Sequence, residues 1–103
     1  MSVIEVNKTN FDEIVLENNK KVMVDFNAEW CGPCKMLKPV LEKVANEVSD
    51  VEFVSVNTDD EEDLAEKYEI ASIPCLVLFD NGEEAKRKVG LMSEKDIKKM
   101  VEE

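Results

Sequence analysis

The sequence predicts an α/β domain in which a mixed central β-sheet of about five strands is sandwiched by four helices. Strand-like and helix-like segments alternate through most of the chain. Such alternation predicts parallel strands joined by right-handed crossovers. The dipeptide Asn81-Gly82, which is typical of tight hairpins, then predicts a closing pair of antiparallel strands. The expected order of elements is therefore β-α-β-α-β-α-β-β-α.

The first half of the chain supplies two strands and two helices. Residues 3–6 predict a short strand, and Thr9 is an N-cap residue that predicts the start of a helix. Residues 22–26 form an apolar run interrupted only by Asp25, as in strands that are covered on both faces. Apolar side chains then recur at helical spacing over residues 36–48, which predicts the second helix.

The second half supplies three strands and two helices. Residues 51–56 predict a strand, and an acidic run precedes a short helix at residues 64–68. Negative charge is favourable at a helix N-terminus, so we interpret that run as a solvated helix start. The apolar residues 76–79 predict a buried strand, and three consecutive basic residues within 84–89 are typical of an edge strand. Ser93 is expected to cap the last helix.

Length and composition favour one globular domain over residues 1–103. No apolar run is long enough to span a bilayer, and the first residues lack the apolar stretch of a signal peptide. We therefore expect a cytoplasmic protein, in which paired thiols are more often redox or metal-binding groups than structural bridges. The formal net charge of −11 makes nucleic acid and anionic membranes poor partners, because an acidic surface repels both.

The run Trp30-Cys31-Gly32-Pro33-Cys34 lies between a predicted buried strand and a predicted helix. Amide N–H groups and the positive dipole end at a helix N-terminus favour a thiolate at Cys31, and the thiolate is the attacking species. Cys34 follows three positions later, so the two thiols meet on the first helical turn. We therefore expect thiol–disulfide exchange in which an exposed Cys31 attacks and a shielded Cys34 resolves the mixed disulfide.

A zinc half-site and an incidental pair are the alternatives for the two cysteines. Zinc usually takes four Cys or His ligands, and the chain has no His and only one further Cys. We therefore expect neither a metal nor a cofactor. An incidental pair would not account for the position of the cysteines between a strand and a helix.

The segment from Asp25 to Lys35 closely resembles the active-site segment of thioredoxins. Further matches are Ile73-Pro74, Phe79-Asp80-Asn81-Gly82-Glu83 and Val89-Gly90, so the resemblance spans essentially the whole chain. It implies a thioredoxin fold and a protein-disulfide reductase that acts on disulfide-containing proteins and is recharged by a thioredoxin reductase. The Gly-Pro pair between the cysteines favours a reductant over the oxidases and isomerases of the same fold.

The resemblance also implies roles for residues around the thiols. In thioredoxins an acidic residue at the position of Asp25 accepts the proton of the second cysteine, and burial should raise its pKa. A structural Asp bonded to backbone is the alternative. The Ile73-Pro74 loop is implied to carry a cis-proline and to pair with the substrate backbone. The implied docking surface comprises Trp30, Gly32, Pro33, Ile73, Pro74 and Gly90.

Three positions depart from the family pattern. Asn27 replaces a common aromatic, which affects packing behind the site. Ser55 stands where some bacterial thioredoxins carry Lys, so the pKa of Asp25 should be higher still. Cys75 follows the proline in place of Thr, either as an inert buried thiol or as a third redox-active one.

A binding module that uses this fold as a scaffold is the competing function. The intact thiol pair argues against it, and replacing both cysteines by Ser would separate the two hypotheses. We expect the protein to be a monomer.

Overall fold

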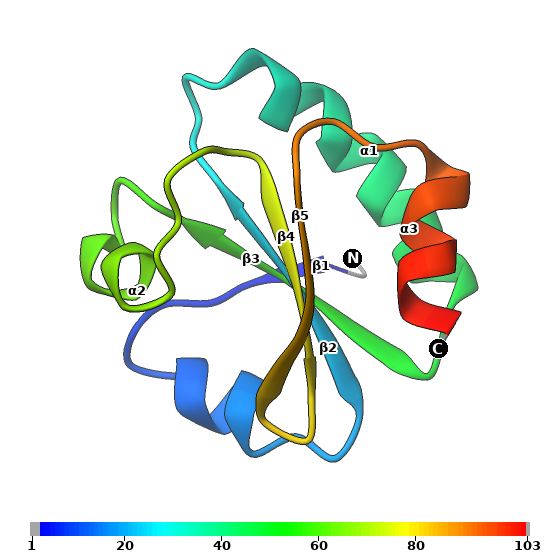
Figure 1. The fold of residues 1–103 in the computed structure, drawn as a ribbon, viewed down its shortest axis with the longest axis horizontal. Coiled ribbons are helices and arrows are strands. Elements are labelled where there is room, and N and C mark those ends of the chain that lie inside the picture. The colour runs from blue at the N-terminus through cyan, green and yellow to red at the C-terminus, as the bar shows by residue number, and fades with distance from the viewer. Residues whose placement is uncertain (1–2, 103) are drawn as a thin grey trace.

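A computed structural model describes residues 3–102 and places the chain in a three-layer arrangement (Figure 1). Nine elements follow one another in the predicted order. They are β1 (Val3–Glu5), η1 (Asp12–Leu16), β2 (Lys21–Asn27), α1 (Gly32–Glu47), β3 (Val51–Asn57), α2 (Glu62–Lys67), β4 (Cys75–Asp80), β5 (Glu83–Val89) and α3 (Glu94–Glu102). The prediction of a mixed sheet between helices is confirmed.

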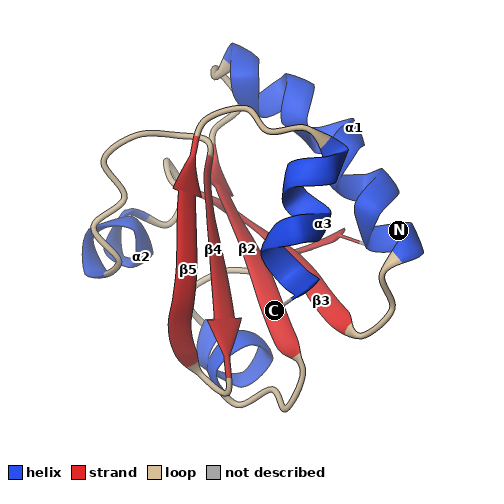
Figure 2. Ribbon diagram, turned by 45° about the vertical axis from the view of Figure 1, so that its right-hand side comes forward, coloured by secondary structure: helices blue, strands red, loops and turns tan. Residues whose placement is uncertain are grey.

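The five strands form one sheet in the order β1-β3-β2-β4-β5. The strands β1, β3 and β2 run parallel, whereas β4 and β5 are antiparallel to their neighbours. Helices cover both faces of this sheet, as Figure 2 shows. The strand with three consecutive basic residues, β5, lies at an edge as predicted, and β2 lies at the centre.

Side chains of β2 alternate between the two faces of the sheet. Val22, Val24 and Phe26 pack with η1 and α2, whereas Met23 packs with α1 and α3. Asp25 follows the same alternation as Met23, so its carboxyl lies on the α1 face. This alternation decides which helix meets the buried acid.

The hairpin between β4 and β5 forms as predicted. Asn81 and Gly82 both have positive φ, 53° and 80°, and glycine adopts such a backbone without strain. A Cβ at position 82 would lie 2.5 Å from the carbonyl oxygen of Leu16. Gly82 is therefore required both by its backbone and by the close approach of η1.

One of the two predicted helix caps is confirmed. The backbone N–H of Asp96 donates to Ser93 Oγ at 3.2 Å, so Ser93 caps α3. The Thr9 cap is wrong, because η1 begins at Asp12 and its N-terminus has no side-chain cap. Thr9 instead lies in a turn in which Asn7 Oδ1 accepts the Thr9 N–H at 2.9 Å.

Candidate dithiol active site

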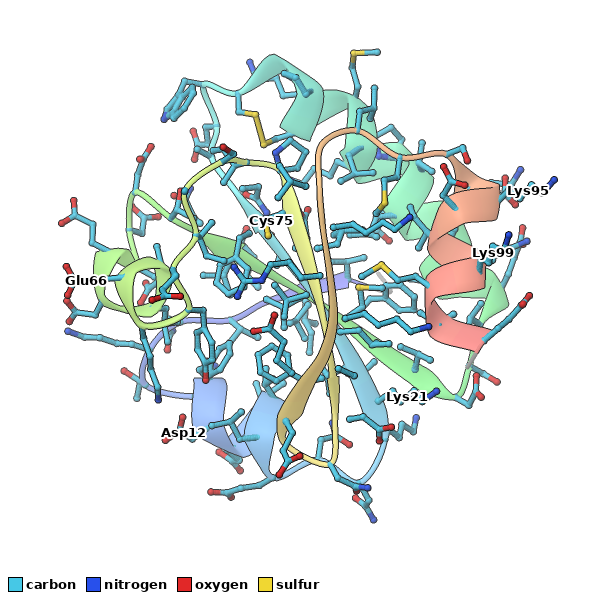
Figure 3. All side chains as sticks on the ribbon, viewed as in Figure 1. Asp12, Lys21, Glu66, Cys75, Lys95 and Lys99 are labelled. Atoms are coloured by element: carbon cyan, nitrogen blue, oxygen red, sulfur yellow. A yellow bond between two sulfur atoms is a disulfide. The ribbon has the colours of Figure 1, made fainter. Side chains whose placement is uncertain are left out.

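The two cysteines of the Cys-Gly-Pro-Cys run lie where the chain passes from β2 into α1. Cys31 has an extended backbone and is the N-cap residue of α1, and Cys34 lies in the first helical turn. Their Cα atoms are 5.2 Å apart and their sulfur atoms form a disulfide, drawn as a yellow bond at the start of α1 in Figure 3. The strand–turn–helix setting predicted for the motif is confirmed.

The helix start acts differently on the two sulfur atoms. The backbone N–H of Cys34 donates to Cys31 Sγ at 3.2 Å, because the Cys31 side chain occupies the capping position. The positive end of the helix dipole adds to this hydrogen bond. Both interactions stabilise negative charge on Cys31 in the reduced protein.

The structure corrects the expected exposure of Cys31. Cys31 and Cys34 are each 4% exposed, so the first cysteine is as buried as the second. Ala28 packs in one cluster with the two cysteines, and the partly buried Ile73 packs against that cluster. Exposure therefore does not distinguish the two thiols.

Asp25 lies behind the disulfide, and only 2% of its surface is exposed. Its Oδ1 atom has no hydrogen-bond partner in the structure. Asp25 and Cys34 line the same cavity, which has a volume of about 330 Å³. Burial raises the pKa of Asp25 from 3.8 to about 7, although hydrogen bonding from Asn27 and the charge of Lys38 act in the opposite direction. The expected rise in pKa is confirmed, and the carboxyl titrates near neutral pH.

Asn27 and Ser55 form a hydrogen-bonded link beside this carboxyl. Asn27 Nδ2 donates to Ser55 Oγ at 2.8 Å and to the backbone oxygen of Asp25 at 2.9 Å. The backbone carbonyl oxygen of Asn27 also accepts two hydrogen bonds from Thr58, one from its backbone N–H at 2.8 Å and one from its Oγ1 hydroxyl at 3.1 Å. Where an aromatic residue is common in the family, this chain therefore ties β2 to β3 and the turn that follows it.

The Ile73–Pro74 peptide bond is cis, as the resemblance implied. Cys31 Sγ lies 3.9 Å from the Ile73 carbonyl oxygen, and the Gly90 N–H donates to the Pro74 carbonyl oxygen at 2.8 Å. The loop is therefore held beside the disulfide. Pro74 itself is buried, so its side chain adds no exposed apolar surface, contrary to the expected docking surface.

The residues on the other side of the disulfide are open to solvent. Trp30 is 70% exposed, and both Gly32 and Pro33 are exposed. Trp30 is therefore not part of the hydrophobic core. Trp30 Nε1 donates to Asp59 Oδ2 at 2.8 Å, a partner that sequence reasoning missed. No local pattern indicates this contact, because the two residues are 29 positions apart.

Lys38 is a second residue near the site that sequence reasoning missed. It lines the same cavity as Asp25 and Cys34. Helical spacing was the available signal, because residues four apart lie on the same side of a helix and Lys38 follows Cys34 by four positions.

Cys75 lies on the other face of the sheet from α1. It is 1% exposed, carries a free thiol and packs with Val77 and Phe79 in the core under η1 and α2. Burial raises the pKa of the Cys75 thiol. Figure 3 shows its sulfur apart from the disulfide bond. These features favour an inert buried thiol.

Comparison with known proteins identifies the family. The family model for thioredoxin matches residues 2–103. A thioredoxin of Mycoplasma genitalium is 47% identical over 90 residues, covering 87% of this chain and 88% of the relative. A thioredoxin of Mycoplasma pneumoniae is 48% identical with 82% of each chain covered, and one of Chlamydia trachomatis is 43% identical with 93% of this chain and 92% of the relative covered.

The matched residues include the strand, the turn and the helix that hold the disulfide. The protein is a protein-disulfide reductase that works by dithiol–disulfide exchange through the Cys31–Cys34 pair. Sequence match, mixed sheet and paired thiols agree, and the chain belongs to the thioredoxin family.

Proposed function

We propose that the protein reduces substrate disulfides in an ordered exchange in which Cys31 attacks, Cys34 resolves and Asp25 accepts a proton. The Cys31 thiolate attacks one substrate sulfur, the substrate disulfide breaks, and the released thiolate takes a proton from water. Cys34 then gives its proton to the Asp25 carboxylate and attacks Cys31 Sγ. This step breaks the mixed disulfide, forms the Cys31–Cys34 disulfide and releases the second substrate sulfur as a thiolate, which takes a proton from water, and Asp25 then returns its proton to solvent. The substrate gains two electrons and two protons, and the pair loses two electrons.

One hydrogen bond supports the proposal that Cys31 attacks first and Cys34 second. Cys31 Sγ accepts the Cys34 N–H at the N-terminus of α1, so negative charge is stabilised on Cys31. Cys34 lies one turn inside the helix, and its sulfur has no equivalent capping position. The thiol that ionises more readily attacks first, and its partner needs a base.

Asp25 has the properties of that base. It shares a cavity with Cys34, and the cavity is lined by polar side chains that suit a bridging water. Its pKa of about 7 leaves both protonation states populated at neutral pH. A general acid–base group works best when its pKa is near the working pH.

The proposed substrate surface combines an exposed side with a backbone loop. Trp30, Gly32 and Pro33 offer exposed apolar contact, while Ile73, Pro74 and Gly90 form the loop on the other side. An extended substrate segment lying along Ile73 would pass close to Cys31, because the Ile73 carbonyl oxygen is 3.9 Å from Cys31 Sγ.

We further propose a thioredoxin reductase as electron donor, disulfide-containing proteins as substrates and the cytoplasm as compartment. The family supports the first two. For the described residues 3–102, no helix has the length and apolar character needed to cross a membrane. We propose that residues 1–103 act as a single domain and as a monomer.

Trapping with a disulfide-containing model protein tests the order of the thiols. Cys34→Ser should accumulate a mixed disulfide through Cys31, because the resolving thiol is gone, and Cys31→Ser should accumulate none. Cys75→Ser is the matched control and should release reduced product as the unmodified chain does. A mixed disulfide that accumulates in Cys31→Ser instead would reverse the assigned roles.

A further inference from the structure

A second, smaller cavity lies next to the one that Asp25 shares with Cys34. Its volume is about 100 Å³, and its polar lining comes from Glu5, Asp25, Lys38, Glu42 and Ser55. Glu5, Asp25 and Lys38 line both cavities. The buried carboxyl and this lysine therefore share two cavities on the α1 face of the sheet.

The register of the sheet explains why there is room beside Asp25. Glu5, Ser55 and Asp25 are directly paired across the parallel strands β1, β3 and β2. Ser55 lies in the middle of this row. Its side chain is short and neutral, so it places no positive charge beside Asp25. Its hydroxyl oxygen accepts a hydrogen bond from the side-chain amide of Asn27. The charge that can oppose burial of Asp25 must therefore come from another element.

The helix α1 supplies that charge. Lys38 follows Cys34 by one helical turn and precedes Glu42 by another, so the three lie on one side of α1. A lysine side chain is long enough to keep its ammonium near solvent while its stem lies over the sheet.

We propose that Lys38 is a positioning residue on α1 that increases the share of Asp25 in its carboxylate form at neutral pH, so that a larger share of the protein is ready to accept the Cys34 proton. This inference rests on the proposed role of Asp25 as the base. The charge of Lys38 lowers the pKa of Asp25 against the larger effect of burial, in agreement with the geometry. Lys38 is itself exposed, so solvent and salt reduce its influence.

Other titratable groups surround Asp25 and define what Lys38 must offset. They are Glu5 from β1, Glu29 from the loop after β2, Cys34, Lys35 and Glu42 from α1, Asp60 from the turn after β3, and Cys75 from β4 on the opposite face. Most of these groups are acids, and negative charge disfavours a second carboxylate nearby. Loss of Lys38 would leave Lys35 as the remaining cation in this set.

Titration of the Asp25 side-chain carboxyl by ¹³C NMR in the oxidised protein tests the inference, since the paired thiols do not titrate in that state. The midpoint of Lys38→Gln should lie above the value of about 7 for the unmodified chain, and Lys38→Arg should restore that value. Lys43→Gln is the matched control, because it makes the same change of charge on the same helix at a residue that lines neither cavity and pairs with Glu94 instead, and it should leave the midpoint in place. Salt at about 1 M should move the Asp25 midpoint of the unmodified chain towards that of Lys38→Gln, because the Debye length falls to about 3 Å and the charge of Lys38 is screened.

The pH dependence of the rate of mixed-disulfide resolution distinguishes an electrostatic role of Lys38 from a structural one, because a structural role would not shift this profile along the pH axis. Lys38→Gln should shift the profile to higher pH without lowering its plateau, so resolution slows at pH 7 and recovers in alkaline solution. An Asp25 midpoint that is the same in Lys38→Gln and the unmodified chain overturns the inference. By contrast, a normal resolution rate in Asp25→Asn overturns the proposed base, whatever Lys38 does to the titration.

Discussion

Replacing Asp25 by Asn should stabilise the protein in a strongly pH-dependent way. Asp25 is 2% exposed and its Oδ1 atom has no hydrogen-bond partner, so the charged form is poorly accommodated in the folded state. The folded pKa is raised from 3.8 to about 7. The folded protein therefore holds a proton that the unfolded chain has released over this whole range of pH.

The sign and size of the effect follow from proton linkage. Where the folded state binds more protons than the unfolded state, the free energy of unfolding falls as pH rises. The contribution of Asp25 is fully favourable below about pH 4 and is lost as pH rises through about 7. At about 1.4 kcal/mol for each pH unit, the loss is about 4 kcal/mol above pH 7.

Urea unfolding of the oxidised protein at about pH 4 and pH 8 measures this effect. The free energy of unfolding of Asp25→Asn, relative to that of the unmodified chain, should increase by about 4 kcal/mol from pH 4 to pH 8. Any cost of the new amide is independent of pH and cancels from this difference. Asp50→Asn, on the exposed surface, controls for the lost charge and should show no such growth. A difference between Asp25→Asn and the unmodified chain that stays constant with pH would refute the reasoning.

The predicted cost of keeping Asp25 is large for a domain of this kind. Small domains are stable by about 5–15 kcal/mol in total, so about 4 kcal/mol is a substantial share. Burial of an unpaired acid is a recurring mark of functional sites, at which stability is given up for reactivity. Asp25→Asn should therefore have a higher free energy of unfolding and, at the same time, a lower rate of mixed-disulfide resolution.

Two further predictions concern residues away from the disulfide. Gly82→Ala should lower the free energy of unfolding by about 1–3 kcal/mol, because φ at this position is 80° and the new Cβ would meet the Leu16 carbonyl oxygen. Thermal unfolding measures this loss of stability, and an unchanged unfolding midpoint would contradict the close approach. Cys75 should resist alkylation in the folded, reduced protein and react after unfolding, since it is 1% exposed with a raised pKa. Mass spectrometry locates the label, and prompt labelling of folded Cys75 would identify a third reactive thiol.

Local patterns were enough to predict the elements and the chemistry of the motif. The apolar run of β2, the helical spacing of α1 and the Asn81-Gly82 turn all depend on neighbouring residues, and all formed as expected. The thiol pair was also predicted, because a strand–turn–helix context is local. The Thr9 cap failed because competing side chains in the same turn, Asn7 among them, satisfy the backbone there.

Contacts between distant segments were not predictable in the same way. The equal burial of Cys31 and Cys34 depends on Ile73, which is far away in sequence. Trp30 is paired with Asp59 for a similar reason. Such contacts depend on how β-strands and loops assemble, and no local spacing encodes them.

By itself, the sequence determined a mixed α/β domain, a thiol pair at a helix start and an acid in a buried strand, because each depends on residue type and short-range spacing. Only the tertiary structure decided what surrounds that acid. The pairing of Glu5, Ser55 and Asp25 across three strands, and the passage of α1 above them, place Lys38 beside the carboxyl. The physical reason is that desolvation and charge act through space, so the pKa of Asp25 depends on the packing of elements that are distant along the chain.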